Sequence, residues 1–282
     1  RRIIEELERG TVPWKKEWVG NAGPFNWITG RPYRGINYWS LTSYPYESSS
    51  WMTFYQIRKG GFHLKRGSRS APVLFWKLLE VADTETGEII KIPFPKIYHV
   101  FNTDLIEGLP KKKENSFGEI LDCESVIQKY ENGPMVVPSP NGGCYYHPLL
   151  DVVSMVPKNQ FTSPEGYYST LFHELIHSTG HSNRLDRGLD SAPHKFGDPN
   201  YSKEELIAEM GAAQLCGITG ISTPTLKNSA AYIDSWLKIL KADRSVLIHA
   251  SQKAQQACDF ILGQGQQLVN QQINNHEQGN SN

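Results

Sequence analysis

The sequence has no stretch of about 18 apolar residues, and this absence excludes a membrane-spanning helix. Its cysteines are too few and too scattered for a disulfide scaffold or a CxxC metal site; they are Cys123, Cys144, Cys216 and Cys258. The first residues, RRIIEELERG, lack the apolar core of a secretory signal. Together these absences predict a protein of a reducing, cytoplasmic setting with no membrane partner.

The sequence also lacks a net charge, yet its charges are unevenly distributed. Residues 1–113 contain 18 Lys and Arg against 11 Asp and Glu, whereas residues 114–282 contain 11 against 18. A basic half joined to an acidic half indicates that the first half meets a polyanion such as nucleic acid. The alternative is that both halves are simply solvated.

The chain is long enough for about two domains, with 282 residues of which 39% are hydrophobic and 11% aromatic. Residues 111–115 are polar and read as a linker. We therefore expect an α+β protein with an N-terminal domain over 1–116 and a C-terminal domain over 117–263. Residues 264–282 are rich in Gln and Asn, and we expect them to be disordered.

Hydrophobic periodicity indicates different elements in the two halves. In the first half it predicts short helices over 2–9 and 51–59, an aromatic loop region over 20–50, and a hairpin formed by 72–81 and 89–102. In the second half it predicts a short helix over 125–130 and strands at 145–146 and 152–156. Four longer helices follow, over 167–179, 203–216, 226–241 and 245–262.

The pattern His-Glu-Leu-Ile-His at 173–177 points to metal chemistry. Residues four apart share one face of a helix, so His173 and His177 can bind one metal ion, as in hydrolytic zinc sites. Glu174 can reach a water on that metal and act as the general base. Leu171, Phe172, Leu175 and Ile176 are expected to form the buried flank. The alternative is an ordinary core helix that contains two histidines.

A third ligand is needed, and the following helix offers three glutamates. Glu205 and Glu209 share one face, so one can bind the metal while the other hydrogen-bonds a ligand histidine. We assign Glu205 as the ligand and Glu209 as its companion, although Ser202 and Glu205 also fit a capping box. Glu204 is expected to be solvated. His181 follows Gly180, where the helix is expected to end, so we expect it to line a pocket or bond a loop.

Zinc is the ion that this ligand set favours, although Mn²⁺ or Co²⁺ fits the same cage. A metallopeptidase would also need a donor that stabilises the oxyanion. The sequence does not choose among the candidates, which are Tyr167, Tyr168, Tyr201 and His194.

Aromatic and basic residues alternate in the first half, a mixture that suits single-stranded nucleic acid because rings stack unpaired bases and cations neutralise phosphates. Trp51, Phe54, Phe75 and Trp76 lie in periodic segments and are expected in the core. The candidate nucleic-acid-binding residues are Trp14, Lys15, Lys16, Trp18, Arg31, Tyr33, Arg34, Asn37, Tyr38, Trp39, Arg58, Lys59, Lys65 and Arg66.

Several motifs, taken in order, resemble the ArdC-type antirestriction proteins of conjugative plasmids. They are LERGTVPWKKEW (7–18), GRPYRGINYWSL (30–41), WMTFYQIRKGG (51–61), VFNTDLIEGLP (100–110), FHELIHSTGHSNRL (172–185) and YSKEELIAEMGAA (201–213). The resemblance implies an N-terminal domain that binds single-stranded DNA and a C-terminal zincin-like metallopeptidase domain. It also implies that His173, His177 and Glu205 hold the metal and that Glu174 is the base.

The resemblance further implies protection of incoming conjugative DNA from host restriction, with single-stranded DNA and an unidentified protein or peptide, such as a restriction component, as partners. Two other hypotheses remain. One is a single-stranded-DNA-binding protein whose metal site is structural or vestigial, without proteolysis. The other is a general metallopeptidase whose basic half recognises an acidic protein.

Overall fold

The computed structural model of the chain describes residues 2–9, 23–82, 89–110, 122–139, 142–161, 163–190, 199–221 and 229–264. Helices and mixed sheets occur together, which confirms the α+β prediction. The predicted tail lies outside the described residues except for Gln264. Within the described residues, no helix combines the length and the apolar character needed to cross a membrane.

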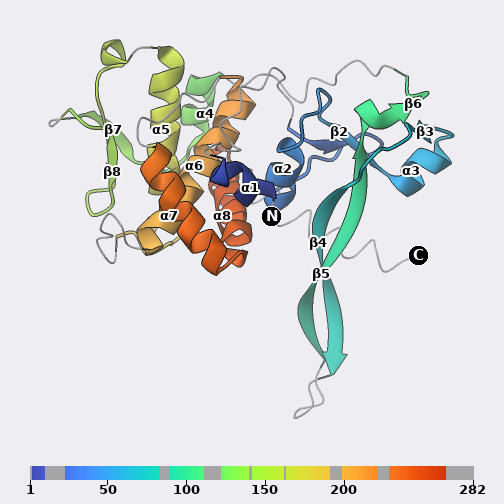
Figure 1. The fold of residues 1–282 in the computed structure, drawn as a ribbon. Coiled ribbons are helices and arrows are strands. Elements are labelled where there is room, and N and C mark those ends of the chain that lie inside the picture. Colours follow the sequence, from blue (N-terminus) through green and yellow to red (C-terminus); the bar gives the residue numbers. More distant parts are fainter. Residues whose placement is uncertain are drawn as a thin grey trace. The chain divides into compact units, whose positions relative to one another are not determined.

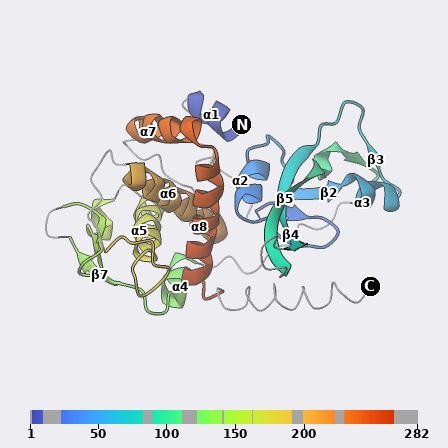
Figure 2. The ribbon, with the colours of Figure 1, turned by 90° about the horizontal axis from the view of Figure 1, so that it is seen from below.

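The chain forms two compact units: Ala22–Asn115, and Arg1–Asn21 with Ser116–Asn282. Helix α1 (Arg2–Glu8) therefore groups with the second half, where it packs against α7 (Ser229–Ala242) (Figures 1 and 2). An ion pair of 2.9 Å between Lys241 Nζ and Glu8 Oε1 joins the two helices. The predicted domain ranges stay predictions, and this helix is where the grouping of contacts differs from them.

The unit Ala22–Asn115 is built on a four-stranded sheet of order β1-β2-β5-β4. Its strands are β1 (Phe25–Asn26), β2 (Ser50–Thr53), β4 (Ala71–Ala82) and β5 (Ile89–Asn102). The last two form the predicted hairpin, a twisted ribbon that runs well beyond β2 (Figure 1). A small second sheet pairs β3 (His63–Leu64) with β6 (Ile106–Glu107).

Two short helices complete this unit: α2 (Ile36–Thr42) and α3 (Phe54–Lys59). Helix α2 lies inside the region predicted as loop, so that prediction was wrong there. The predicted helix 51–59 was wrong at its start, which belongs to strand β2. A capping box at Thr53 marks the change from strand β2 to helix α3. The Thr53 side chain accepts a hydrogen bond from Gln56 N, and the Gln56 side chain accepts one from Thr53 N.

The core of this unit lies between the sheet and the segments that precede it. It contains Tyr33, Leu41, Trp51, Val73 and Val100. Trp51 is buried, as predicted, whereas Phe54, Phe75 and Trp76 are 55%, 45% and 48% exposed. The prediction of core positions for those three rings was wrong, because the periodic segments extend past the residues that could cover them.

The other unit packs helices on a three-stranded sheet of order β7-β9-β8. The strands are β7 (Met135–Pro138), β8 (Tyr145–His147) and β9 (Val152–Met155), and α4 (Cys123–Lys129) precedes them. Helix α5 (Pro164–Ser178) packs against β8 and β9, and α6 (Pro199–Thr219) packs against α5, α7 and α8 (Ser245–Ile261) (Figure 2). The four predicted long helices are confirmed, with shifted bounds.

Candidate metal centre

Helix α5 positions the two histidines because its start and its buried face are both well defined. The side chain of Ser163 accepts a hydrogen bond from Gly166 N, and Pro164 occupies the first turn, where its missing N–H costs nothing. Leu171, Phe172, Leu175 and Ile176 are buried, as predicted. His173 and His177 therefore lie together on the remaining face, which α6 covers.

Three side chains converge at this face: His173 and His177 from α5 and Glu205 from α6. The two Nε2 atoms are 3.1 Å apart. Glu205 Oε2 lies 3.5 Å from His173 Nε2, and Glu205 Oε1 lies 3.4 Å from His177 Nε2. The structure thus brings together the three residues that the sequence predicted as ligands.

These distances suit a shared divalent ion. Ligands at about 2.0–2.1 Å from a tetrahedral zinc ion stand roughly 3.3 Å from one another. The two Nε2 atoms lie 3.1 Å apart, and each lies 3.4–3.5 Å from one of the two Glu205 oxygens, distances close to that spacing. One donor atom from each of the three residues lies within 4.8 Å of the others. Two imidazoles and one carboxylate are also the donor types of a catalytic zinc site that keeps one position open. The residues present therefore fit a metal ion.

The two histidines and Glu205 shift one another's pKa values. Burial opposes the charged form of His173, but the hydrogen bond with Glu205 outweighs it and raises the pKa of the imidazole. Burial likewise opposes the charge of His177, and there Glu204 and Glu205 raise the pKa well above 6.5. Burial also disfavours the charge of Glu205, but both imidazoles hold the pKa of this carboxyl far below its ordinary value. Without metal, the site therefore binds protons where the ion would sit.

Glu204 is not solvated, so that prediction was wrong. It is buried, and its Oε1 lies 3.2 Å from His177 Nδ1, the ring nitrogen that faces away from the shared centre. Arg187 holds the same carboxylate from the other side, with Nη2 at 2.7 Å from Oε1 and Nε at 2.9 Å from Oε2. Glu204 thus orients His177, a role that usually sets the tautomer of a ligand histidine.

Glu209 lies near the other histidine, one helical turn after Glu205. Its Oε1 is 3.8 Å from His173 Nδ1 and the side chain is buried. That position agrees with its predicted place beside a ligand histidine, at a distance longer than a hydrogen bond. The buried face of α6 therefore presents Glu204, Glu205 and Glu209 to the two imidazoles.

Glu174, the predicted base, is buried on the side of α5 that faces strand β8. Its Oε2 accepts a hydrogen bond of 2.8 Å from the backbone N–H of Tyr146. This bond fixes the carboxylate while leaving Oε1 available to a second partner. Sequence patterns could not reveal the contact, because its donor is a backbone group 28 residues away.

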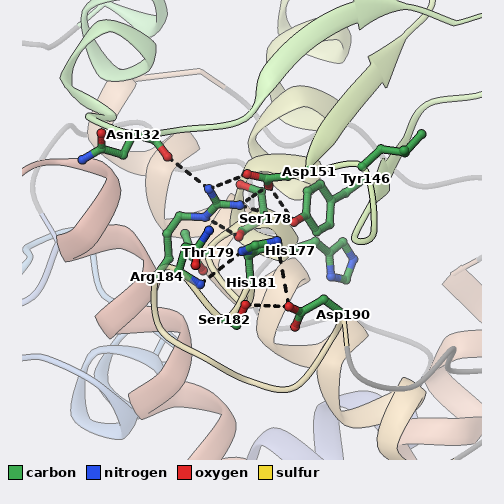
Figure 3. Close-up of polar contacts among 12 residues, drawn as sticks. Asn132, Tyr146, Asp151, His177, Ser178, Thr179, His181, Ser182, Arg184 and Asp190 are labelled. Carbon is green, nitrogen blue, oxygen red and sulfur yellow. Dashed lines mark hydrogen bonds and ion pairs between the residues drawn. The ribbon is translucent and has the colours of Figure 1, made fainter.

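A buried arginine holds the loop that follows α5 against strand β8 (Figure 3). Arg184 forms a two-pronged ion pair with Asp151, and its Nε donates to Ser178 O at 2.7 Å. Its Nη1 also donates to Asn132 O at 3.0 Å. Asp151 in turn accepts from the hydroxyl of Tyr146 at 2.8 Å. Tyr146, whose backbone N–H donates to Glu174, is therefore also held in place by the hydrogen bond of its own hydroxyl to Asp151.

His181 lies in the loop after α5 and makes loop contacts, as predicted (Figure 3). Its Nδ1 accepts a hydrogen bond of 3.1 Å from Asn183 N, and its Nε2 lies 3.9 Å from Asp190 Oδ2. Ser182 donates to the same Asp190 oxygen at 2.6 Å. His181 is not among the groups that converge with His173 and His177 in the described part of the chain.

Two of the candidate oxyanion donors are engaged near the start of α5. Tyr168 donates its hydroxyl to Glu124 Oε1, and Lys158 Nζ lies 5.0 Å from the centres of both the Tyr167 and Tyr168 rings. His194 lies outside the described residues. Tyr201 is half-buried in the first turns of α6, and its role stays a prediction.

The predicted nucleic-acid-binding residues divide by burial. Tyr33, Asn37 and Trp39 are buried, so their faces are not offered to a base. Asn37 instead bonds the backbone of Leu74, donating to its O at 2.7 Å and accepting from its N at 2.6 Å. Seven others are exposed or half-buried: Arg31, Arg34, Tyr38, Arg58, Lys59, Lys65 and Arg66. The remaining four, Trp14, Lys15, Lys16 and Trp18, lie outside the described residues.

Two known families match different parts of the chain. Residues 1–101 match the family described as the N-terminal domain of anti-restriction factor ArdC. Residues 131–253 match the family described as zincin-like metallopeptidase, which includes His173, His177 and Glu205. The two matches therefore cover different parts of the chain, and the second contains the metal centre.

Similar proteins of known sequence or structure include a primase and an antirestriction protein. The chain is 33% identical to the DNA primase TraC of Escherichia coli over 96% of its own length and 27% of that protein, so it spans about a quarter of that relative. It is 35% identical to the ArdC antirestriction protein of plasmid R388, crystallised without metal, covering 94% of this chain and 96% of that one with a TM-score of 0.77. The Mn(II)-bound structure of the same protein gives 34% identity, coverage of 94% and 95%, and a TM-score of 0.76.

Proposed function

Because this chain belongs to the ArdC family of antirestriction proteins, we propose that it binds single-stranded DNA and protects incoming conjugative DNA from host restriction, with a zinc-dependent peptidase centre in its second half. The observation that carries the enzymatic part is the convergence of His173, His177 and Glu205 beside the oriented carboxylate of Glu174. Zinc is the proposed ion because of the donor types and their spacing.

The proposed chemistry assigns a separate task to each group of residues. A bound divalent ion would polarise a scissile carbonyl and make a water molecule more acidic. His173, His177 and Glu205 would hold that ion. Glu174 would take a proton at Oε1 and later return it to the leaving amine, while Tyr146 N–H holds its Oε2 in place. Glu204 would keep the Nε2 atom of His177 directed at the ion by bonding Nδ1.

The DNA-binding part of the proposal rests on charge and on exposed side chains. The first 113 residues carry an excess of basic side chains, and several aromatic and basic residues of the unit Ala22–Asn115 are exposed. Unpaired bases offer faces for stacking that a duplex hides, so single-stranded DNA is the expected ligand. The protein substrate of the peptidase centre belongs to the proposal as well, and a restriction component is one candidate.

Two measurements test the enzymatic part. Metal analysis of protein purified without a His-tag and without added zinc should find about one zinc per chain in the wild type and a loss of zinc in His173→Ala. Antirestriction should then be compared in cells that carry the wild type or Glu174→Gln. If Glu174→Gln protects DNA as well as the wild type, the function is DNA binding with a structural metal and proteolysis is not involved.

The DNA-binding part has its own test. Titrations with oligo-dT and with duplex DNA should show a clear preference for oligo-dT, and the affinity should fall as salt rises because phosphate neutralisation releases counterions. Equal binding to both DNAs, or binding that does not change with salt, would contradict it. A preference for acidic proteins over oligo-dT would support a general metallopeptidase instead.

A further inference from the structure

The hairpin of β4 and β5 presents two different faces to its surroundings. The strands pair without interruption from Ala71↔Val100 to Ala82↔Ile89. Because side chains alternate along a strand, Val73, Phe75 and Lys77 share one face with their partners Tyr98, Lys96 and Phe94. The opposite face carries Leu74, Trp76, Pro95 and Ile97.

The first of these faces begins in the core and continues beyond it. Ala71, Val73 and Val100 are buried at one end. The same face then continues with six described side chains of the ribbon, all exposed except the half-buried Tyr98. We call five of them the ribbon face: Phe75, Lys77, Phe94, Lys96 and Tyr98. The sixth, Leu79, lies farther along β4 and is 43% exposed.

Rings and cations alternate on the ribbon face. Phe75 is paired across the strands with Lys96, and Lys77 is paired with Phe94. Phe75 also meets the Tyr98 ring edge-on at 5.7 Å between centres, and Lys96 Nζ lies 5.2 Å from the centre of the Tyr98 ring. The phenylalanine rings remain 45% and 52% exposed in this arrangement, so these contacts leave much of their surface open.

The described part of the opposite face is also apolar; farther along, the register places Lys91 on it, across from Glu80. Trp76 and Ile97 are 48% and 63% exposed there. Among the side chains of that face that the structure describes, none is Lys or Arg. Both faces of the ribbon therefore expose apolar side chains, and the described lysines, Lys77 and Lys96, lie on the first face.

We propose that the ribbon face is a docking surface for single-stranded DNA, with bases stacked on Phe75 and Phe94 and phosphates neutralised by Lys77 and Lys96. This inference rests on the proposed DNA binding and names its surface. The sequence-predicted candidates did not include these residues, and Phe75 was expected in the core because it lies in a periodic segment.

The chemistry of the face selects this occupant. Side chains two residues apart on one strand stand about 6.6–6.8 Å apart, so on each strand of the ribbon a ring and a cation follow one another at that spacing. An unpaired strand can lie along the ribbon while its bases and phosphates meet these alternating rings and cations. A duplex hides its base faces and would use only the lysines. A protein partner would not need a cation directly across from each phenylalanine.

Matched double truncations on the two faces test the proposal. Phe75→Ala/Phe94→Ala should weaken binding to oligo-dT roughly 10- to 100-fold in a fluorescence anisotropy titration, as expected when stacked bases lose their rings. Trp76→Ala/Ile97→Ala removes two exposed apolar side chains from the opposite face and should change the affinity less than about twofold. Circular dichroism and unfolding midpoints of both variants should match the wild type, because all four side chains are at least 45% exposed.

The lysines give a second and independent readout. Each lost phosphate contact lowers the slope of log affinity against log salt by about 0.7 for a single strand, so Lys77→Ala/Lys96→Ala should reduce it by about 1.4. A reduced slope with intact folding supports the proposal even if the phenylalanine variant folds poorly.

The outcomes separate this proposal from the function on which it rests. If the wild type binds oligo-dT and both face variants bind equally well, or both weaken equally, the assignment of the ribbon face is overturned while DNA binding stands. If the wild type shows no preference for oligo-dT over duplex, the proposed DNA-binding function fails first. Weakening confined to the opposite-face variant would also overturn the assignment.

Discussion

The backbone N–H of Tyr146 donates a hydrogen bond of 2.8 Å to Glu174 Oε2, so strand β8 holds the carboxylate that follows the first ligand histidine. Glu174 is buried, and the bond satisfies a backbone donor that water does not reach. The position of the predicted base is therefore set by two elements, α5 and β8.

This contact predicts different outcomes for two substitutions of Glu174. Glu174→Gln keeps an oxygen acceptor for Tyr146 N–H, so its free energy of unfolding should stay within about 0.5 kcal/mol of the wild type. Glu174→Ala leaves that buried donor without its acceptor and should cost about 1–3 kcal/mol. Urea unfolding of the metal-free proteins measures both. Equal stability of the two variants would contradict the importance of the bond.

Glu204→Gln should weaken metal binding even though Glu204 is not a ligand. Loss of the carboxylate beside His177 Nδ1 should reduce the affinity about 10- to 100-fold, the usual effect of removing such a partner. Competition with a chromophoric chelator measures this, and Glu205→Ala should lose far more as the matched comparison. Arg187 would keep a hydrogen-bond acceptor in Glu204→Gln, so a loss of folding is not expected.

Metal binding should strengthen as pH rises. Burial opposes the charge of His177, yet Glu204 and Glu205 raise its pKa well above 6.5, so the metal-free imidazole keeps its proton to higher pH than an ordinary histidine does. The ion must displace that proton, and affinity should gain up to about tenfold per pH unit for each proton released until pH exceeds the raised pKa. Chelator competition between pH 6 and 9 checks the trend. An affinity that levels off below pH 6.5 would contradict it.

Arg184→Met should destabilise the second unit. The substitution removes the partner of Asp151 and the donors to Ser178 O and Asn132 O, and we expect a loss of about 2–3 kcal/mol. Arg184→Lys should recover only part of this loss because an ammonium group cannot form the two-pronged pair. Thermal and urea unfolding measure the effect. A stability equal to the wild type would show that the network contributes nothing.

Gly211→Ala should disturb the metal centre through packing. A Cβ at this position of α6 would lie 2.7 Å from Ile176 Cδ1 and 2.9 Å from its Cγ1, so the Ile176 side chain or the two helices would have to shift. We expect a destabilisation of about 1–3 kcal/mol together with weaker metal binding. Adding Ile176→Val removes the atom at 2.7 Å and should restore part of both. Failure of the second substitution to restore either quantity would contradict the steric explanation.

The ligands were predictable from the sequence because their spacing is a local property of helices. His173 and His177 lie one turn apart on α5, and Glu205 lies on the next helix, α6. Glu204 was mispredicted because the orientation of α6 depends on how it packs against α5, and because Arg187 reaches its carboxylate from a loop. No periodic pattern contains that information.

The ribbon shows a second limit of local patterns. Its two strands were predicted well, since the β-rich runs over 72–81 and 89–102 flank a turn and indicate a hairpin. Alternation also suggested that Phe75 and Trp76 would be covered, yet coverage depends on other segments that extend only as far as Val73 and Val100. Helix α2 was missed because it begins at Ile36 directly after Gly35, which has a positive φ of 54° and offers no side-chain cap.

The side chain of Asn37 has a wider consequence for this unit. Its amide donates to Leu74 O and accepts from Leu74 N, so it bonds β4 as a neighbouring strand would. An open edge invites pairing with the same edge of another molecule, which is a common start of aggregation. By occupying the N–H and C=O of Leu74 with one amide, Asn37 takes both groups of this residue away from pairing with a strand of another molecule.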